Sequence, residues 1–267
     1  MFHLLKIEWL KIKYYRTFWI LSVLFLISIF GINYISYYVQ GQVQNQVPKG
    51  NVAASAILGA SPFQFPAVWQ TVAYMSGFLL FIPGLLIIIS ITNEFSYKTH
   101  RQNIIDGLSR TQFIVVKMLL VVIIALLSTL AVFITAFFFG IAEGSAAISF
   151  ANIQYIAYFF VQTLSYTSLG LLFGLLFKRS GIAIGVFFLY VVVLEHMLGA
   201  ILNHYTDNAG NFLPLSSSVT LIPFPFLRNV VNQFFKPPDA LYLLIASAIY
   251  LVIYYFACKR KFEIDDL

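Results

Sequence analysis

The chain has 267 residues, of which 60% are hydrophobic, 18% aromatic and only 10% charged, and its formal net charge is +6. This composition lies outside the usual range of a soluble globular domain and predicts an integral membrane protein. A single cysteine, Cys258, excludes an internal disulfide, and the four histidines lack the paired spacings of a zinc or haem site. We therefore expect neither metal nor redox chemistry in this chain.

Six apolar runs are long enough to cross the roughly 30 Å of membrane hydrocarbon as helices. They cover residues 17–39, 71–92, 118–139, 153–177, 182–202 and 240–258. The runs do not alternate as barrel strands do, so helices are the expected form. The first run is too long for the core of a cleaved signal peptide. The sequence thus predicts an all-α polytopic membrane protein, with residues 1–267 forming a single transmembrane domain.

Lysine and arginine accumulate on the cytoplasmic side of membrane proteins, so their distribution predicts orientation. With an even number of spans and a cytoplasmic N-terminus, 13 of the 16 basic residues lie in inner segments and 3 in outer segments. The three outer ones are Lys49, Arg228 and Lys236. We expect a multi-pass protein of the cell (inner) membrane with both termini cytoplasmic. The positive charge then indicates topology and contact with anionic lipid, and no nucleic-acid partner is expected.

The N-terminal stretch "FHLLKIEWLKIKYYR" has the helical spacing of an amphipathic helix. Its apolar positions are Leu4, Leu5, Trp9 and Ile12, against Lys6, Lys11 and Lys13. Basic residues with an interfacial tryptophan are typical of a helix lying in the headgroup plane of the membrane. The prediction is an interfacial helix before the first span, which serves either as an anchor alone or also as a surface for a partner.

The second span contains Pro83 and Gly84 in "FLLFIPGLLIII". A proline inside a helix removes one backbone donor and clashes with the preceding turn, so a bend is expected there. The bend is either a fixed feature that improves packing or a hinge between two transport states.

The segment "NEFSYKTHRQNIIDGLSRTQFIVVK", residues 93–117, concentrates charge between the second and third spans. Ser109 and Gln112 have the spacing of a capping box, which predicts that the third helix begins there. Just before it, Ile104, Ile105 and Leu108 are expected to share one face of a short amphipathic helix, with Gly107 allowing the turn. The segment is either an ordinary positively charged inner loop or a docking surface.

Two ionisable residues, Glu195 and His196, interrupt the fifth apolar run. A carboxylate in hydrocarbon is costly unless it is hydrogen-bonded or protonated, so Glu195 should face the helix bundle or a subunit seam. It is expected either to hold outer-loop amides or Arg228, or to act directly in the passage of cargo.

The outer segment of residues 203–239 interrupts short apolar pieces with prolines. These prolines are Pro214, Pro223, Pro225, Pro237 and Pro238. Pieces too short to cross predict re-entrant or interfacial segments between spans 5 and 6, and the alternative is a surface loop with aromatic anchors.

The chain as a whole resembles the type-2 ABC exporter permeases, chiefly through the segment of residues 93–117. Positions Glu94, Thr99, Gly107, Ser109, Arg110 and Lys117 match the family's pattern after the second span, whereas "RQN" at 101–103 replaces a more apolar run. The resemblance implies that this segment forms a coupling helix in a cleft of a cytoplasmic ABC ATPase. The residues assigned to coupling are Glu94, Thr99, Arg101, Asp106, Gly107, Ser109, Arg110 and Lys117.

No phosphate-binding loop and no hydrolytic motif occur in the sequence, so we expect no enzyme activity in this chain. The resemblance implies that ATP and Mg²⁺ bind to a partner ATPase, and that a second permease subunit, identical or different, completes the transporter in membrane lipid. The spans carry little charge, which favours a hydrophobic or amphipathic cargo such as a lipid, peptide antibiotic or drug. A secondary transporter or channel, and a membrane scaffold that recruits a cytoplasmic partner, are the alternatives.

Overall fold

The computed structural model describes residues 2–46, 61–144, 147–206, 208–226 and 238–264, and the regular elements in these ranges are all helices. The first half contains α1 Phe2–Lys13, α2 Arg16–Gln46, α4 Val68–Gly77, α5 Phe81–Ser96, α6 Thr99–Ile105 and α7 Arg110–Ala142. The second half contains α8 Gln154–Phe177, α9 Ser180–Leu189, η1 Tyr190–Leu194, α10 Glu195–Tyr205, η2 Ala209–Phe212, α11 Ser216–Val219 and α13 Ala240–Ile264.

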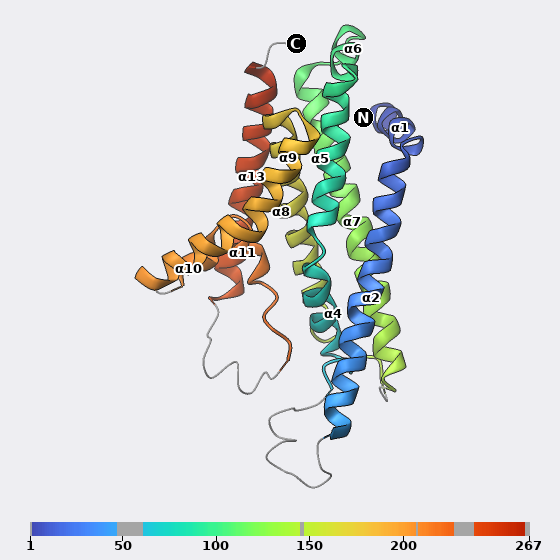
Figure 1. The fold of residues 1–267 in the computed structure, drawn as a ribbon, viewed down its shortest axis with the longest axis vertical. Coiled ribbons are helices and arrows are strands. Elements are labelled where there is room, and N and C mark those ends of the chain that lie inside the picture. Colours follow the sequence, from blue (N-terminus) through green and yellow to red (C-terminus); the bar gives the residue numbers. More distant parts are fainter. Residues whose placement is uncertain (1, 47–60, 145–146, 207, 227–237, 265–267) are drawn as a thin grey trace.

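The long helices run side by side along the longest axis of the molecule (Figure 1). Helix α8 lies at the centre, since 67% of its most apolar stretch is buried, compared with 17% for α2. Helices α1 and α6 and the end of α13 lie at one end of the bundle, hereafter the α6 end (Figure 1). Helix α4 lies toward the opposite end (Figure 1).

Five of the helices are long and apolar enough to cross a membrane, or six if the bent pair of α4 and α5 counts as one span. This agrees with the expected all-α polytopic class. The helices also extend beyond the predicted apolar runs, as α2 reaches Gln46, α7 begins at Arg110 and α13 reaches Ile264. These extensions are polar turns that hydropathy alone assigns to loops, but the helical hydrogen bonds continue through them.

The second span is bent by 47° between α4 and α5, at residues 78–80. Pro83 lies just after this break, in the first turn of α5, and has no amide hydrogen to donate to the carbonyl of Leu79, four positions earlier. The expected bend is therefore present. Close packing accompanies it, because a Cβ atom added to Gly170 of α8 would lie 2.7 Å from the carbonyl oxygen of Gly84. The backbones of α5 and α8 thus touch beside the proline.

The fifth span is less regular than the sequence indicated. The π-helical turn η1 separates α9 from α10, and α10 is angled away from the bundle axis (Figure 1). The following segment contains the short helices η2 and α11. Arg228 and Pro237 lie outside the described residues. Short helices are thus present where re-entrant or interfacial segments were expected, and their depth in the membrane stays a prediction.

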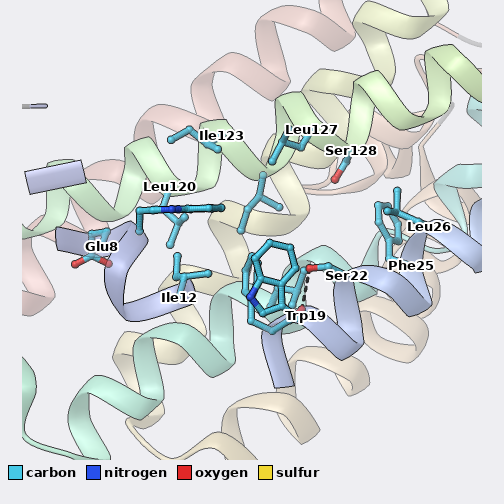
Figure 2. A pocket seen from close by; sticks show the side chains of 14 residues that line it. Glu8, Ile12, Trp19, Ser22, Phe25, Leu26, Leu120, Ile123, Leu127 and Ser128 are labelled. Atoms are coloured by element: carbon cyan, nitrogen blue, oxygen red, sulfur yellow. Dashed lines mark hydrogen bonds between the residues drawn. The ribbon is translucent and has the colours of Figure 1, made fainter. Parts of the chain in front are cut away.

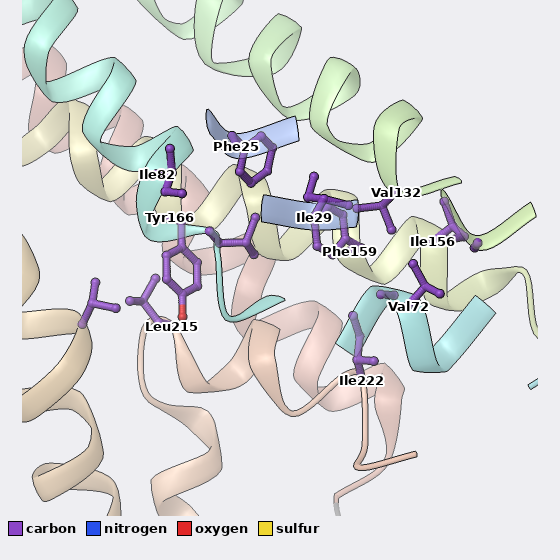
Figure 3. Close-up of a cluster of buried hydrophobic side chains, with 14 of the residues drawn as sticks. Phe25, Ile29, Val72, Ile82, Val132, Ile156, Phe159, Tyr166, Leu215 and Ile222 are labelled. Atoms are coloured by element: carbon purple, nitrogen blue, oxygen red, sulfur yellow. The ribbon is translucent and has the colours of Figure 1, made fainter. Parts of the chain in front are cut away.

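Two clusters of buried apolar side chains hold the bundle together. The larger one joins α2, α4, α7 and α8, and includes Ile29, Val72, Val132 and Phe159 (Figure 3). The smaller one lies at the α6 end and joins α1 to α7 and α13, where the rings of Phe113 and Phe262 stack with centroids 4.4 Å apart. The smaller cluster supports the charged side chains described next.

Candidate functional site

Helix α6 is an elbow between α5 and α7, and left-handed residues flank it. Lys98 precedes it with φ 57°, and Gly107 follows it with φ +97°. Glycine adopts positive φ without the steric cost that a Cβ atom brings, which is why the chain can turn there. The predicted role of Gly107 in the turn is confirmed.

The capping box at the start of α7 is also confirmed. The Ser109 hydroxyl accepts a hydrogen bond from the Gln112 amide at 3.2 Å, and the Gln112 side chain accepts one from the Ser109 amide at 3.0 Å. Two otherwise free amides are satisfied by these bonds, so the helix begins at Arg110. The elbow therefore has a fixed end.

The elbow presents a mixed polar and apolar surface at the α6 end. Ile105 is 78% exposed and Tyr97 is 75% exposed, and Arg101 and Asp106 are exposed beside them. The predicted shared face is wrong for Ile105, because only Ile104 and Leu108 pack against the smaller apolar cluster. Neighbouring residues of a helix point about 100° apart, so Ile105, the last residue of α6, is turned away from the side on which Ile104 packs.

His100 holds the inner side of the elbow, and sequence reasoning missed it. Its Nδ1 atom lies 2.9 Å from the Glu94 carbonyl oxygen, and its ring centroid lies 4.6 Å from that of Phe95. His100 is buried, although its neighbours Arg101 and Gln102 are exposed. A lone histidine in a polar stretch gives no periodic signal that could have predicted this burial.

A buried ion network ties α1, α5 and α7 together. The Nζ atom of Lys117 lies 2.5 Å from Oε2 of Glu8 and also contacts Oε1 of Glu94. The Nζ atom of Lys11 lies 2.9 Å from Glu8 Oε1 and 3.1 Å from Glu94 Oε1. The Lys117 side chain is only 2% exposed, and both carboxylates are less than a tenth exposed.

Two ammonium groups balance two carboxylates in this network, which is the condition for burying charge at a tolerable cost. Burial acts to raise the pKa of the Glu8 carboxyl, but the charges of Lys117 and Lys11 and their hydrogen bonds outweigh it and hold the pKa below 4.5. The network therefore joins the N-terminal helix to both helices that flank the elbow.

The predicted coupling residues divide into two groups. Arg101, Asp106 and Gly107 are exposed on the elbow, whereas Glu94 and Lys117 are buried in the ion network and have no surface for a partner. Glu8 and Lys11 were not among the predicted site residues. The only sequence signal for them was one acidic residue within a basic helix, three positions before a lysine.

The start of α7 is attached to the end of α13. The guanidinium group of Arg110 donates to the Glu263 carbonyl oxygen, and the Thr111 hydroxyl donates to the Glu263 carboxylate at 3.3 Å. Arg110 thus has an internal partner, although the sequence grouped it with the docking residues. Thr99 is the first residue of α6, and the Ser109 side chain caps α7.

An apolar pocket of about 560 Å³ lies between α1, α2, α5 and α7 (Figure 2). Trp9 and Trp19 line it with their rings 6.2 Å apart, and Glu8 is at its edge. Trp9 is 52% exposed, whereas Ile12 from the same predicted apolar face is buried. Helix α1 thus has Ile12 against the bundle and Trp9 turned outward.

A second polar region, far from the elbow along the chain, surrounds Glu195 at the start of α10. Its Oε1 atom accepts hydrogen bonds from the amides of Leu215 and Ser216, both at 2.9 Å, and from the Ser216 hydroxyl at 3.1 Å. Glu195 is 3% exposed, so it faces the bundle as the sequence predicted. These contacts are the outer-loop amide bonds that the sequence left as one alternative for Glu195.

Glu195 and His196 also line a cavity of about 580 Å³, hereafter the Glu195 cavity. The His196 ring nitrogen Nδ1 lies 3.2 Å from the Val191 carbonyl oxygen. Gln162 and Tyr166 of α8 form the facing wall, and Figure 3 shows the Tyr166 side chain beside the segment of Leu215. In the described part of the chain, no group of three or more His, Cys, Asp or Glu side chains could hold a metal ion.

The fold and these sites define a polytopic helical membrane protein with a rigid elbow at one end and a polar cavity farther along the bundle. Its sequence matches the profile of the ABC-2 family transporter proteins over residues 62–256. This match covers most of the chain, so the protein belongs to the ABC-2 transporter family and is an ABC transporter permease. A search of curated proteins found no match.

Proposed function

We propose that the chain is the membrane-spanning subunit of an ATP-driven exporter, and that α6 docks into a cytoplasmic ABC ATPase. Membership of the ABC-2 family supports an ATPase partner. The chain carries no phosphate-binding loop, so ATP and Mg²⁺ belong to that partner. The 13-to-3 distribution of basic residues supports a cytoplasmic location of the α6 end and of both termini.

The observation that carries the proposal is the exposed tip of α6. Two large side chains, Tyr97 just before α6 and Ile105 at its end, are more than 70% exposed. Arg101 and Asp106, which have opposite charges, are exposed on the same segment. Exposed large apolar side chains together with charged ones are the composition of a protein interface.

Motion of this tip reaches the membrane through rigid contacts. His100 holds α6 to the end of α5, the capping box fixes the start of α7, and the Lys117 network joins α7 to α5 and α1. The Phe113–Phe262 stack extends the connection to α13. Displacement of α6 by an ATPase therefore moves three spans and the interfacial helix together, which is how nucleotide-driven motion would reach the cargo path.

The transporter is a dimer of permease subunits, identical or paired with a sister chain, and its cargo is hydrophobic or amphipathic. Six helices with one charged cavity residue offer little to a strongly polar ion or sugar. Lipids, peptide antibiotics and hydrophobic drugs fit this description. The membrane is the cell (inner) membrane.

The test is purification of the permease from its native membranes, followed by identification of the ATPase that accompanies it. Ile105→Asp and Arg101→Glu should remove a P-loop ATPase from the preparation, because a charge in an apolar interface or a reversed rim charge weakens docking. Arg110 is left unchanged because it holds Glu263.

Two matched control variants are available on α13. Ile264 is 69% exposed and Arg260 is exposed, and both lie at the α6 end but off the elbow. Ile264→Asp and Arg260→Glu should keep the ATPase. A preparation without any P-loop ATPase, combined with transport driven by an ion gradient or with no transport, would replace the proposal by a secondary transporter or a scaffold.

A further inference from the structure

We propose that the Glu195 cavity binds the primary ammonium group of a cationic amphiphile, which makes this class of molecule the cargo. The inference rests on the proposed transport function and deepens it, because the sequence and family leave the chemical class of the cargo open. It is argued from the atoms that line the cavity.

Two residues that line the cavity, Glu195 and Gln162, each carry a buried acceptor atom without a hydrogen-bond donor. Oε1 of Glu195 accepts hydrogen bonds from the amides of Leu215 and Ser216. The buried Oε2 atom has no hydrogen-bond partner of normal geometry. The Tyr190 hydroxyl is a polar neighbour of the Glu195 carboxylate. The buried Oε1 atom of Gln162 also lacks a hydrogen-bond partner. Buried acceptors of this kind are rare in native structures because each one costs free energy.

The sign of the charge selects the ligand. Glu195 is the only carboxylate among the described residues that line the cavity, and no lysine or arginine is among them. An ammonium group supplies three donors and no acceptor, which matches a carboxylate oxygen and an amide oxygen. A phosphate or carboxylate headgroup would instead meet like charge and unpaired acceptors.

The remaining walls suit the rest of an amphiphile. Tyr74, Phe78, Phe81 and Tyr166 provide aromatic surfaces, which attract cations through their ring faces. Phe78 is 61% exposed on the outside of the bundle, so the cavity continues onto the lipid-facing surface. A volume of about 580 Å³ lies within the usual range of ligand sites.

The same ammonium chemistry occurs in phosphatidylethanolamine, so the experiment separates a cargo amphiphile from a membrane lipid. The full-length permease is placed in nanodiscs of phosphatidylcholine, whose quaternary ammonium group has no N–H donor. The probe is a dansyl-labelled long-chain alkylammonium, and the comparison ligand is its neutral N-acetylated form. Fluorescence then measures both affinities.

The ammonium probe should bind about tenfold more tightly than the neutral one, the ratio expected for one charge-assisted hydrogen bond. Glu195→Gln keeps an oxygen for the α11 amides and should abolish the difference. Gln162→Met removes the second acceptor without touching α11 and should reduce it. Glu143→Gln changes a carboxylate that lines a different pocket and should leave it unchanged.

Equal affinity for the two probes, no binding of either, or full discrimination in Glu195→Gln would overturn the proposal. Displacement of the probe by phosphatidylethanolamine at membrane levels would assign the site to that lipid and overturn the cargo assignment. The measurement needs no ATPase. If an ATPase copurifies but the permease does not prefer the ammonium probe, only this binding site is refuted. If the permease prefers the ammonium probe but no ATPase copurifies, only the exporter assignment is refuted.

Discussion

The ion network at the α6 end and the Glu195 cavity both contain buried carboxylates, and they stabilise them in different ways. At the α6 end, Glu8 and Glu94 are neutralised by Lys117 and Lys11 from within the chain. In the cavity, Glu195 has amides and a hydroxyl on one oxygen and no described ammonium or guanidinium group within ion-pair distance.

The comparison separates a region whose charges balance from one whose charge does not. The ion network pairs two ammonium groups with two carboxylates and ties three helices together, although Oε2 of Glu94 has no hydrogen-bond partner. An uncompensated carboxylate beside a cavity keeps the capacity to pair. We therefore read the ion network as a mechanical joint and the cavity as a binding site, and the following variants test that division.

Lys117→Met should have the largest effect. Removing the central ammonium group leaves Glu8 and Glu94 buried with only Lys11, and breaking a buried ion pair in this way costs about 3–5 kcal/mol. The yield of monodisperse protein and its thermal midpoint should both fall sharply. Lys98→Met, at an exposed lysine of the elbow, should behave like the wild type. Normal stability of Lys117→Met would show that the network is not a joint.

Glu195→Leu should destabilise the protein less, by about 1–3 kcal/mol, because it leaves the Leu215 and Ser216 amides without an acceptor. Glu195→Gln should retain most of the thermal stability. If the two variants melt together, hydrogen bonding to α11 is not what Glu195 contributes to folding. This pair separates the structural role of Glu195 from its charge.

Gly170→Ala should cost about 1–3 kcal/mol, since its Cβ atom would meet the backbone oxygen of Gly84 at 2.7 Å. The contact joins α5 to α8, so it lies on the route between the ion network and the cavity. Gly185→Ala has open space for its Cβ atom and is the control. A thermal midpoint equal to that of Gly185→Ala would mean that the two backbones can separate freely.

Pro83→Ala should change stability little but slow transport severalfold if the bend between α4 and α5 is a hinge. The new alanine has the backbone amide hydrogen that proline lacks, so it can restore a helical hydrogen bond and straighten the span. Transport and ATP hydrolysis by the reconstituted complex are the measurements, normalised to the amount of folded permease. Unchanged transport would leave the bend as a packing feature.

The contribution of Glu8 to stability should depend little on pH near neutrality and should fall in acid. The pKa of Glu8 is lower in the folded protein than its ordinary value of 4.5, so its stabilising contribution is complete above pH 4.5 and is lost as the pH falls through the folded value. The difference in thermal midpoint between wild type and Glu8→Gln should therefore be constant from about pH 6 to 8 and shrink in acid. A difference that grows in acid would contradict this sign.

Local features of the site could be predicted because their causes are local. The capping box needs only Ser109 and Gln112, the turn needs Gly107, and the bend needs Pro83. The error at Ile105 had a local cause too, since Ile105 directly follows Ile104 and therefore points about 100° away from it on the helix. Patterns within one turn of a helix thus predicted contacts within that turn and no farther.

The sequence by itself determined the membrane class, the number of apolar runs and the asymmetry of basic charge, because hydropathy and charge are properties of single residues and short windows. Only the tertiary structure decided that Glu8 meets Lys117 across 109 positions, and that Glu195 meets amides 20 and 21 residues away. Such pairings depend on how helices pack and where a span breaks, and no periodicity within either segment specifies them. The tertiary structure therefore distinguished the closed joint of Lys117 from the open cavity of Glu195.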